Sequence, residues 1–404
     1  MTKALIACYG NFRTLPEIPY VLKKGGCDVV DILCSRESSL LHNKFYDNWI
    51  RCDKDKEDYA DKLIKTVEHN KYDWVILGDE HILKLMNERI TSNELFTTIM
   101  PLKKIENRMI LSSKVGLSDV CMRLSITTPK YLVVQNVEEL KAAPFSLRFP
   151  VLIKQDVSTG GQGISYCKTT EELIQVMKNN PAQKKAIIQE YITGRDIGVE
   201  ALYKDGILLT YNVSEVLEYL DSRFGTTTKR NYFNSLELEQ LLVDLGQKVG
   251  INGFASIQYI HDELDKQYYL IEADLRPNIW VASSRFTGKD FSEGVQQFLG
   301  KLPITPECYK PAEGYDKTVK VFLFSRDVVR CFKKKRPVQF LCWLIDPRLW
   351  KFVPTYDFKL LRYQISNIRK DIWAIVVVYL KTHLNKKKDK EVKNNRPIPS
   401  SVNY

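Results

Sequence analysis

Short, mostly apolar runs alternate with amphipathic stretches along the first part of the chain. Three of these runs have the length and composition of buried strands: Ala4–Cys8, Val29–Cys34 and Trp74–Leu77. Leu15–Lys24 has helical spacing and stops at two glycines, and Tyr59–Glu68 is amphipathic. Strands that alternate with helices in this way predict a parallel, doubly wound sheet for residues 1–115, a Rossmann-like domain. No GxGxxG follows the first strand, so a dinucleotide site is not indicated.

Shorter, mixed elements follow and predict a small α+β unit over residues 116–188. Its expected strands are Tyr131–Val134, Pro150–Lys154 and Ile164–Cys167, with helices at Val137–Ala142 and Thr170–Lys178. A larger unit over residues 189–300 comes next. Its pattern predicts a hairpin of Asp196–Tyr203 with Gly206–Asn212, a helix at Leu236–Val249, and strands at Gly253–Ile260 and Gln267–Ala273. The expected fold class is therefore α/β and α+β, with a C-terminal extension over residues 301–404.

The composition is that of an ordinary globular protein, with 44% hydrophobic and 27% charged residues in a chain of 404. Nine cysteines are scattered without a CxxC pair or zinc spacing. With no secretory leader in the sequence, we expect reduced thiols and a cytoplasmic protein. The longest membrane candidate, Ile372–Leu380, has nine residues and is too short to span a bilayer.

Positive charge is concentrated at the end of the chain. Residues 330–404 hold 18 Lys and Arg against 5 Asp and Glu, a net charge of +13, whereas the whole chain carries +11. Basic clusters at Lys333–Arg336 and Lys386–Lys388 flank stretches that mix aromatic, apolar and basic residues. Residues 331–404 therefore fit a peripheral helix on an anionic membrane surface, and fit equally a helical cap with a solvated basic end. Nucleic acid is a weaker partner, since residues 1–329 show no basic surface.

Two segments carry candidate nucleotide-binding groups. Lys154 ends an apolar strand, where a cation suits a phosphate oxygen. The loop after it is rich in small residues whose backbone NH groups can close over phosphates: Ser158, Gly160, Gly161 and Gly163. An ordinary hairpin loop with a surface lysine accounts for the same residues.

The segment Gln189-Glu190-Tyr191-Ile192 offers an edge for a base. The Glu190 carboxylate and neighbouring backbone groups can pair with adenine, and Asp196 can hold ribose hydroxyls. Taken alone, an exposed acid at a strand end is the simpler interpretation of Glu190.

Acidic residues at the end of a later strand predict a metal site. Glu272 and Asp274 lie two apart and so face the same side, and antiparallel pairing can bring Gln258 beside them. Two carboxylates and an amide oxygen suit Mg²⁺ or Mn²⁺. Arg276 follows on the same face, where it can stabilise a transferring phosphoryl group. The competing interpretation is a salt-bridged strand end.

A basic segment lies between these groups. Arg223, Lys229 and Arg230 can bind a γ-phosphate or an acidic substrate. A solvated loop is equally consistent with them.

The order of these motifs resembles that of the ATP-grasp superfamily: a strand lysine, a glycine-rich loop, the QEYI segment and the EADLRPN run at 272–278. The resemblance covers residues 105–300 and is strongest to the branch of carbamoyl-phosphate synthetase and carboxylate–amine ligases. It implies that Lys114 and Lys154 hold phosphates, Glu190 the adenine and Asp196 the ribose. It also implies that Gln258, Glu272 and Asp274 bind the metal, with Arg276 beside them. The third metal position is usually Asn in this family, and here it is Asp274.

The resemblance further implies ATP, Mg²⁺ and a ligase reaction. Mg-ATP would phosphorylate a small-molecule carboxylate, and an amine would then displace phosphate to give an amide. Arg276, Lys229 and Arg230 are the expected catalytic residues. The sequence identifies neither substrate and indicates no oligomeric state. A nucleotide-binding regulatory module without turnover, or a membrane-surface scaffold, is the alternative.

Overall fold

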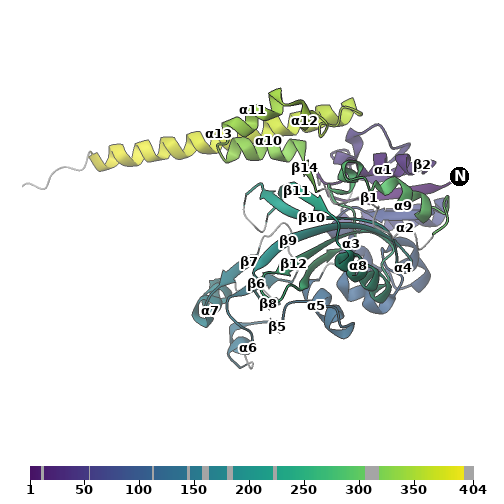
Figure 1. Ribbon diagram of the computed structural model, residues 1–404, viewed down its shortest axis with the longest axis horizontal. Helices are drawn as coiled ribbons and strands as arrows, with labels where there is room; N and C mark the ends of the chain where they lie inside the picture. Colours follow the sequence, from purple (N-terminus) through teal and green to yellow (C-terminus); the bar gives the residue numbers. More distant parts are fainter. Residues whose placement is uncertain are drawn as a thin grey trace, which may run out of the picture. The chain divides into compact units, whose positions relative to one another are not determined.

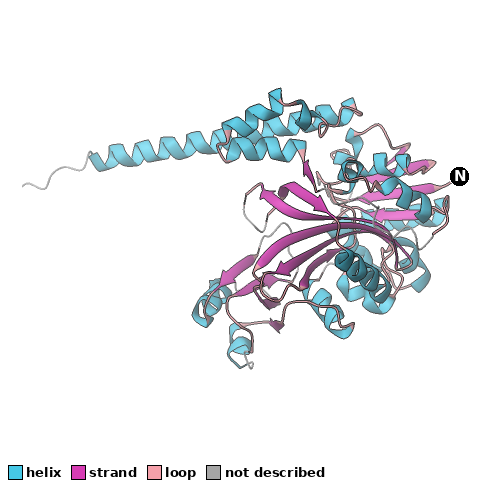
Figure 2. Ribbon diagram, in the orientation of Figure 1, coloured by secondary structure: helices cyan, strands magenta, loops and turns pink. Residues whose placement is uncertain are grey.

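The computed structural model of the chain describes residues 1–10, 13–53, 55–111, 113–142, 146–156, 163–179, 185–221, 225–304 and 318–394, with side chains described as far as residue 381 (Figure 1). The chain divides into two compact units, Met1–Phe322 and Leu323–Tyr404. The first unit contains a parallel sheet, two antiparallel sheets and the helices around them (Figure 2). The second unit is helical. The predicted fold class is therefore confirmed.

The N-terminal sheet has the strand order β3-β2-β1-β4, with every pairing parallel. Its strands are β1 Lys3–Cys8, β2 Val29–Cys34, β3 Asn48–Arg51 and β4 Trp74–Leu77. Its helices are α1 Ile18–Lys24, α2 Lys56–Asn70, α3 Glu80–Arg89 and α4 Asn93–Ile99, with a 3-10 turn, η1, at Ser39–His42. The sequence pattern did not predict β3, because this short edge strand is mostly exposed and has no apolar run.

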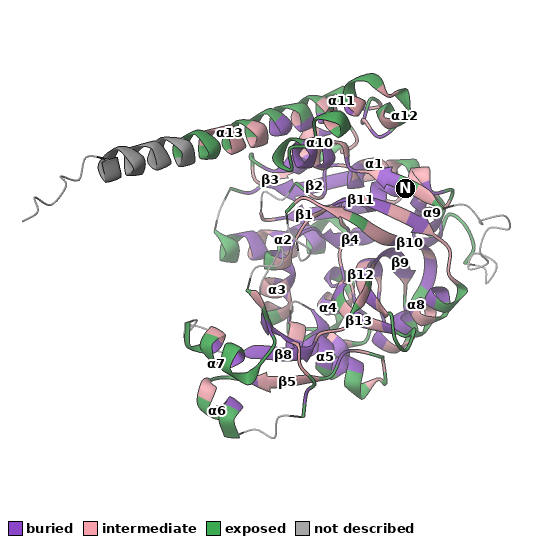
Figure 3. Ribbon diagram, turned by 60° about the vertical axis from the view of Figure 1, so that its left-hand side comes forward, coloured by how far each residue is buried: buried purple, intermediate pink, exposed green. Residues whose placement is uncertain are grey.

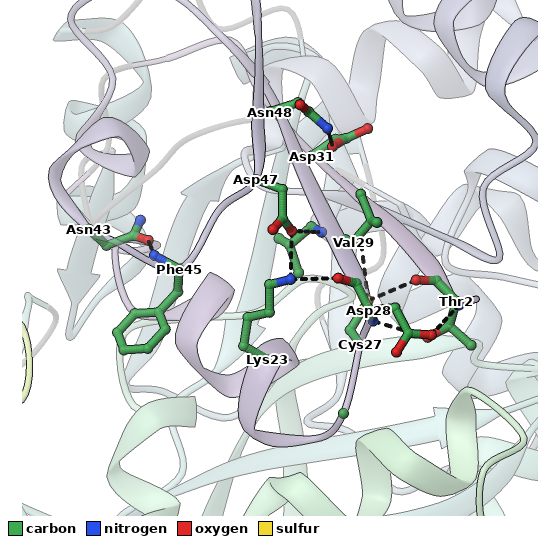
Figure 4. Close-up of polar contacts among 12 residues, drawn as sticks. Thr2, Lys23, Cys27, Asp28, Val29, Asp31, Asn43, Phe45, Asp47 and Asn48 are labelled. Carbon is green, nitrogen blue, oxygen red and sulfur yellow. Dashed lines mark hydrogen bonds and ion pairs between the residues drawn. The ribbon is translucent and has the colours of Figure 1, made fainter.

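A polar network joins the end of α1 to the starts of β1, β2 and β3 (Figure 4). The Asp47 carboxylate accepts hydrogen bonds from the Val30 backbone NH at 2.7 Å and the Lys23 ammonium at 2.6 Å. Lys23 also donates to the Asp28 carbonyl at 2.7 Å, and the Asp28 carboxylate accepts from the Thr2 NH at 2.6 Å. These bonds tie the end of α1 to the strands beside it.

The small antiparallel sheet has the order β5-β8-β6-β7. Its strands are β5 Tyr131–Val134, β6 Val151–Gln155, β7 Ile164–Cys167 and β8 Ala186–Glu190, and its helices are α6 Val137–Ala142 and α7 Thr170–Asn179. Its apolar side chains form a core of their own, which includes Val134, Ile153 and Leu173. Before it in the chain lie η2, a 3-10 turn at Ile105–Ile110, and α5, Lys114–Arg123.

The large antiparallel sheet has the order β13-β12-β9-β10-β11-β14. Its strands are β9 Gly194–Lys204, β10 Ile207–Tyr219, β11 Thr227–Phe233, β12 Gly253–Asp262, β13 Tyr268–Asp274 and β14 Val319–Phe322. The other elements here are α8 Leu236–Val249, η3 Val281–Phe286 and α9 Phe291–Phe298. Central strands such as β9 are mostly buried (Figure 3).

Two apolar cores join this sheet to the N-terminal one. One contains Leu5 and Ala7 of β1 together with Val199 of β9, and the other contains Ile6 of β1 together with Leu202 of β9. Alternate residues of β1 thus enter different cores, as expected for a sheet covered on both faces. Because the two sheets share these cores, their strands are held at fixed positions relative to each other.

As far as residue 394, the second unit contains four helices: α10 Phe324–Lys333, α11 Pro337–Ile345, α12 Pro347–Trp350 and α13 Phe358–Asn394. Leu360, Gln364, Asn367 and Ile368 of α13 are buried at helical spacing, and α13 packs against α10. No helix in the described part of the chain has the length and apolar content needed to cross a membrane.

Candidate active site

One cavity of about 340 Å³ in the first unit gathers most of the predicted site residues. It is lined by residues of α3, α5, both antiparallel sheets and the loop after β13. The predicted residues that line it are Lys114, Lys154, Gln189, Glu190, Ile192, Asp196, Arg230, Gln258, Glu272, Asp274 and Arg276. Segments far apart in the sequence therefore meet at one place.

The predicted metal ligands come from two paired strands. Gln258 of β12 lies directly opposite Glu272 of β13, and Ser256 lies opposite Asp274. This register places the amide and the first carboxylate side by side, as the strand periodicity predicted. The Arg276 guanidinium contacts the Asp274 carboxylate at 2.7 Å between Nη2 and Oδ2.

The electrostatics at these strands favour a cation. The pKa of Asp274 is raised to about 7, chiefly by burial and in part by the Glu272 and Glu80 carboxylates, while Arg276 opposes the rise. Concentrated negative charge and three oxygen donors match the ligand preference of Mg²⁺. Among the described residues no group of three or more His, Cys, Asp or Glu side chains could hold a metal ion, so a metal here would rely on the Gln258 amide oxygen as well as the carboxylates.

Lys154 is buried at the end of β6. Its ammonium donates to the Gln189 amide oxygen of β8 at 2.7 Å. The pKa of Lys154 is lowered to about 8, chiefly by burial, while Glu272 opposes the shift and Lys114 adds to it. A buried ammonium beside a second lysine is suited to bind an anion, because an anion would offset both charges.

Asp156 holds the N-terminus of α5 against the small sheet. Its Oδ1 accepts hydrogen bonds from the Ser113 hydroxyl at 2.8 Å and the Val115 NH at 3.0 Å. Ser113 in turn caps α5 by accepting from the Gly116 NH at 2.8 Å. Lys114, the first residue of α5, is thereby positioned at the cavity. The sequence analysis did not identify Asp156.

The groups proposed for a base and a ribose are held by neighbours. The Glu190 carboxylate is buried and accepts from the Arg148 NH at 2.9 Å. The Asp196 carboxylate accepts from the Tyr219 hydroxyl. Ile192 lines the same part of the cavity. Binding of adenine and ribose by these residues stays a prediction.

The segment with Lys229 and Arg230, for which a solvated loop was one of two interpretations, is strand β11. Arg230 is buried, and its Nη1 lies 2.7 Å from Oε1 of Glu200, itself buried on β9. Its guanidinium also lies 4.5 Å from the Trp280 ring centroid. The interpretation of Arg230 as part of a solvated loop is therefore wrong.

Lys229 occupies the other face of β11. Adjacent residues of a strand point in opposite directions, and the Lys229 ammonium lies 4.9 Å from the Phe322 ring centroid. Lys229 is not among the residues that line the cavity, so the geometry gives no support to a catalytic role for it.

Part of the predicted phosphate loop cannot be compared. Ser158, Gly160 and Gly161 lie outside the described residues, as does Arg223. Gly163 has a φ of +75°, and a Cβ there would lie 2.8 Å from the Gln155 side chain. The need for glycine at this position follows from both observations.

One further residue that lines the cavity, and the buried partner of Arg230, were missed from the sequence. Glu80 follows β4 at the start of α3 and lines the cavity, which a search of the carboxyl ends of the parallel strands would have found. Glu200 lies in the middle of an apolar strand and accepts from Asn278 Nδ2 at 3.1 Å as well as from Arg230. No local pattern marks Glu200, since its partners are distant in the sequence.

Comparison with known proteins agrees with this geometry. A model of the ATP-grasp domain matches residues 111–278. The carbamoyl phosphate synthase large chain of Clostridium beijerinckii is 27% identical over 279 residues, which cover 64% of this chain and 25% of that protein. A homologue from Clostridium botulinum is 29% identical over 215 residues, 50% of this chain and 20% of that one. The chain thus spans a quarter or less of the length of these relatives.

Solved structures share the fold. The biotin carboxylase domain of a Hydrogenobacter thermophilus 2-oxoglutarate carboxylase has a TM-score of 0.56 at 17% identity, covering 76% of this chain and 72% of that one. The L-amino acid ligase of Bacillus licheniformis has a TM-score of 0.54 at 14% identity, covering 80% of each chain. The resemblance inferred from the motifs is confirmed over residues 111–278, which match the ATP-grasp domain model, and the solved structures share the fold.

Proposed function

We propose that this protein is an ATP-dependent ligase that activates a carboxylate as an acyl phosphate for attack by an amine. The observation that carries the proposal is the convergence of Gln258, Glu272 and Asp274 with Lys154 and other cations on one cavity. Relatives named as carbamoyl phosphate synthase and a fold shared with an amino acid ligase support it.

The oxygen donors fit Mg²⁺, as their pairing and the raised pKa of Asp274 indicate. Glu272, Asp274 and Gln258 would hold the ion, which when bound supplies positive charge to the polyphosphate. Lys154 and Lys114 would hold phosphate oxygens. Arg276, ion-paired with Asp274, would stabilise charge on the transferring phosphoryl group.

The reaction needs no protein nucleophile. A carboxylate oxygen of the substrate attacks the γ-phosphorus of ATP, and the bond from that phosphorus to the bridging oxygen breaks, so ADP leaves. The amine nitrogen then attacks the acyl carbon, loses a proton and expels phosphate. Positioning and charge neutralisation carry such a transfer, which matches a cavity lined by Lys, Arg and carboxylates.

Isotope transfer tests the intermediate directly. Purified full-length protein is incubated with Mg-ATP and ¹⁸O-labelled carboxylates, each with a panel of amines, and released phosphate is analysed by mass spectrometry. The expected result is ADP release that requires a carboxylate, with one ¹⁸O atom in each phosphate.

Two variants set the controls. Glu272→Gln should abolish ADP release, whereas Glu263→Gln, an exposed acid in the turn after β12, should leave it unchanged. Magnesium-dependent nucleotide binding without ADP release in any combination would instead favour a regulatory module. Unlabelled phosphate from a turning-over enzyme would rule out the acyl phosphate.

A further inference from the structure

The second unit exposes an unusual helix. Helix α11 has the sequence PVQFLCWLI, in which all seven residues other than the proline and the glutamine are apolar, yet only Trp343 is buried. The α11 ribbon is mostly in the colour of exposed residues in Figure 3. Val338, Leu341, Leu344 and Ile345 are between 51% and 73% exposed. At about 100° per residue these four side chains fall within an arc of about 120°, so they form one apolar face. We call these four residues the α11 face.

Two side chains of α11 are hydrogen-bonded to α10, and the Trp343 ring also packs on the Phe324 ring, with 5.4 Å between the centroids. The Trp343 indole donates to Asp327 Oδ2 of α10 at 3.0 Å, and Gln339 Oε1 accepts from Arg330 Nη2 at 3.1 Å. Arg330 also donates to Asp327 Oδ1 at 2.8 Å, and both residues are buried. These bonds fix the rotation of α11 about its axis. The aliphatic side chains are therefore held outward, the reverse of an ordinary surface helix.

Positive charge borders the α11 face. The exposed cluster Lys333–Arg336 directly precedes the helix, and Arg348 follows it. The Lys335 ammonium lies 5.5 Å from the Tyr379 ring centroid of α13. The basic cluster therefore adjoins a second apolar run, Ile372–Leu380, in which Trp373, Val378, Tyr379 and Leu380 are exposed.

We propose that the α11 face and its basic border dock on an anionic lipid bilayer. Exposed aliphatic residues framed by lysine and arginine match both halves of such a surface, its acyl region and its acidic headgroups. The α11 face is less suited to a protein partner, because its border is rich in lysine and lysine is depleted in protein interfaces. Neither apolar run is long enough to cross the bilayer, so the binding is peripheral.

Vesicle flotation of the full chain tests the proposal. The vesicles contain phosphatidylcholine alone or phosphatidylcholine mixed with phosphatidylserine. We expect binding to the mixed vesicles that weakens with added salt, because each basic residue near an anionic surface contributes about a fivefold factor in affinity. Leu344→Gln together with Ile345→Gln should weaken binding by about tenfold or more.

The matched control is Leu264→Gln, which replaces a 90% exposed leucine of the first unit and should leave binding unchanged. Brominated lipid should quench tryptophan fluorescence in the parent but not in the double variant. Equal binding of parent and double variant, or no preference for phosphatidylserine, would overturn the proposal. Loss of a parent dimer in the double variant, without vesicle binding by the parent, would assign the face to a second copy instead. No nucleotide is present, so the result is independent of the proposed ligase activity.

Discussion

Replacing Glu200 by glutamine should destabilise the first unit more than any comparable change of an exposed acid. Glu200 is 1% exposed and is the ion-pair partner of Arg230, at 2.7 Å. The substitution keeps the shape and an oxygen acceptor but removes the negative charge. Arg230 would then remain buried as a cation, with the Trp280 ring and a neutral amide as its neighbours.

The magnitude follows from the burial of both partners. Breaking a buried pair by removing one charge costs about 3–5 kcal/mol, because the remaining charge has lost its solvent and its partner. The unit Met1–Phe322 has 322 residues, and at about 2.1 cal/mol/K per residue its unfolding entropy is about 0.7 kcal/mol/K. Glu200→Gln should therefore lower the Tm of this unit by about 4–7 °C.

Calorimetry of the full chain measures the shift, with Glu263→Gln as the exposed control, expected within about 1 °C of the parent. The double variant Glu200→Gln, Arg230→Met should be more stable than Glu200→Gln alone, since it removes the uncompensated cation. If Glu200→Gln has the same Tm as Glu263→Gln, the uncompensated charge of Arg230 has no measurable cost and the reasoning is refuted. It is also refuted if the double variant has a lower Tm than Glu200→Gln, because the buried Arg230 charge would then not be the cause of the destabilisation.

Two further predictions concern Lys154, which lines the cavity, and Gly116 of α5. Because the pKa of Lys154 is lowered to about 8, the charged fraction of this side chain falls from about nine-tenths at pH 7 to about one-tenth at pH 9. Nucleotide affinity should therefore drop about tenfold between these pH values, which titration calorimetry measures. The Lys154→Met variant should bind nucleotide weakly and without this pH dependence. Gly116→Ala would place a Cβ 1.9 Å from the Met109 carbonyl oxygen. This clash should lower the free energy of unfolding, measured with denaturant, by about 1–3 kcal/mol. Met122→Ala, which changes an exposed side chain on the same helix, should have little effect.

Local periodicity was sufficient to predict the elements that position the metal ligands. Apolar runs located β12 and β13, and the two-residue repeat placed Glu272 and Asp274 on one face. Antiparallel pairing then required only the correct register to bring Gln258 opposite Glu272. Each of these inferences depends on residues close together in the sequence, which is why the strands and the ligand set could be predicted.

Strand β11 was hidden because its buried positions are not apolar. Thr228, Arg230 and Tyr232 alternate inward along Thr227–Phe233, so the strand repeat is present but is carried partly by polar side chains. A buried arginine is stable only with a partner, and that partner, Glu200, is 30 residues away. Sequence periodicity cannot supply a compensating charge that tertiary structure brings in, and the role of Asp156 was missed for a similar reason, since its partners Ser113 and Val115 are 43 and 41 residues away.

The α11 helix shows a second limit of the hydrophobic pattern, which left a membrane-surface helix and a helical cap equally open for residues 331–404. An apolar run indicates how much surface needs covering but does not indicate what covers it. Which side of a helix is covered depends on the contacts that its neighbours make. Here the Trp343–Asp327 and Gln339–Arg330 hydrogen bonds turn the side of α11 that carries Trp343 and Gln339 toward α10. Hydrogen bonds of two side chains thus determine that the aliphatic residues face outward. The inference of a bilayer surface therefore depends on this geometry rather than on hydrophobicity alone.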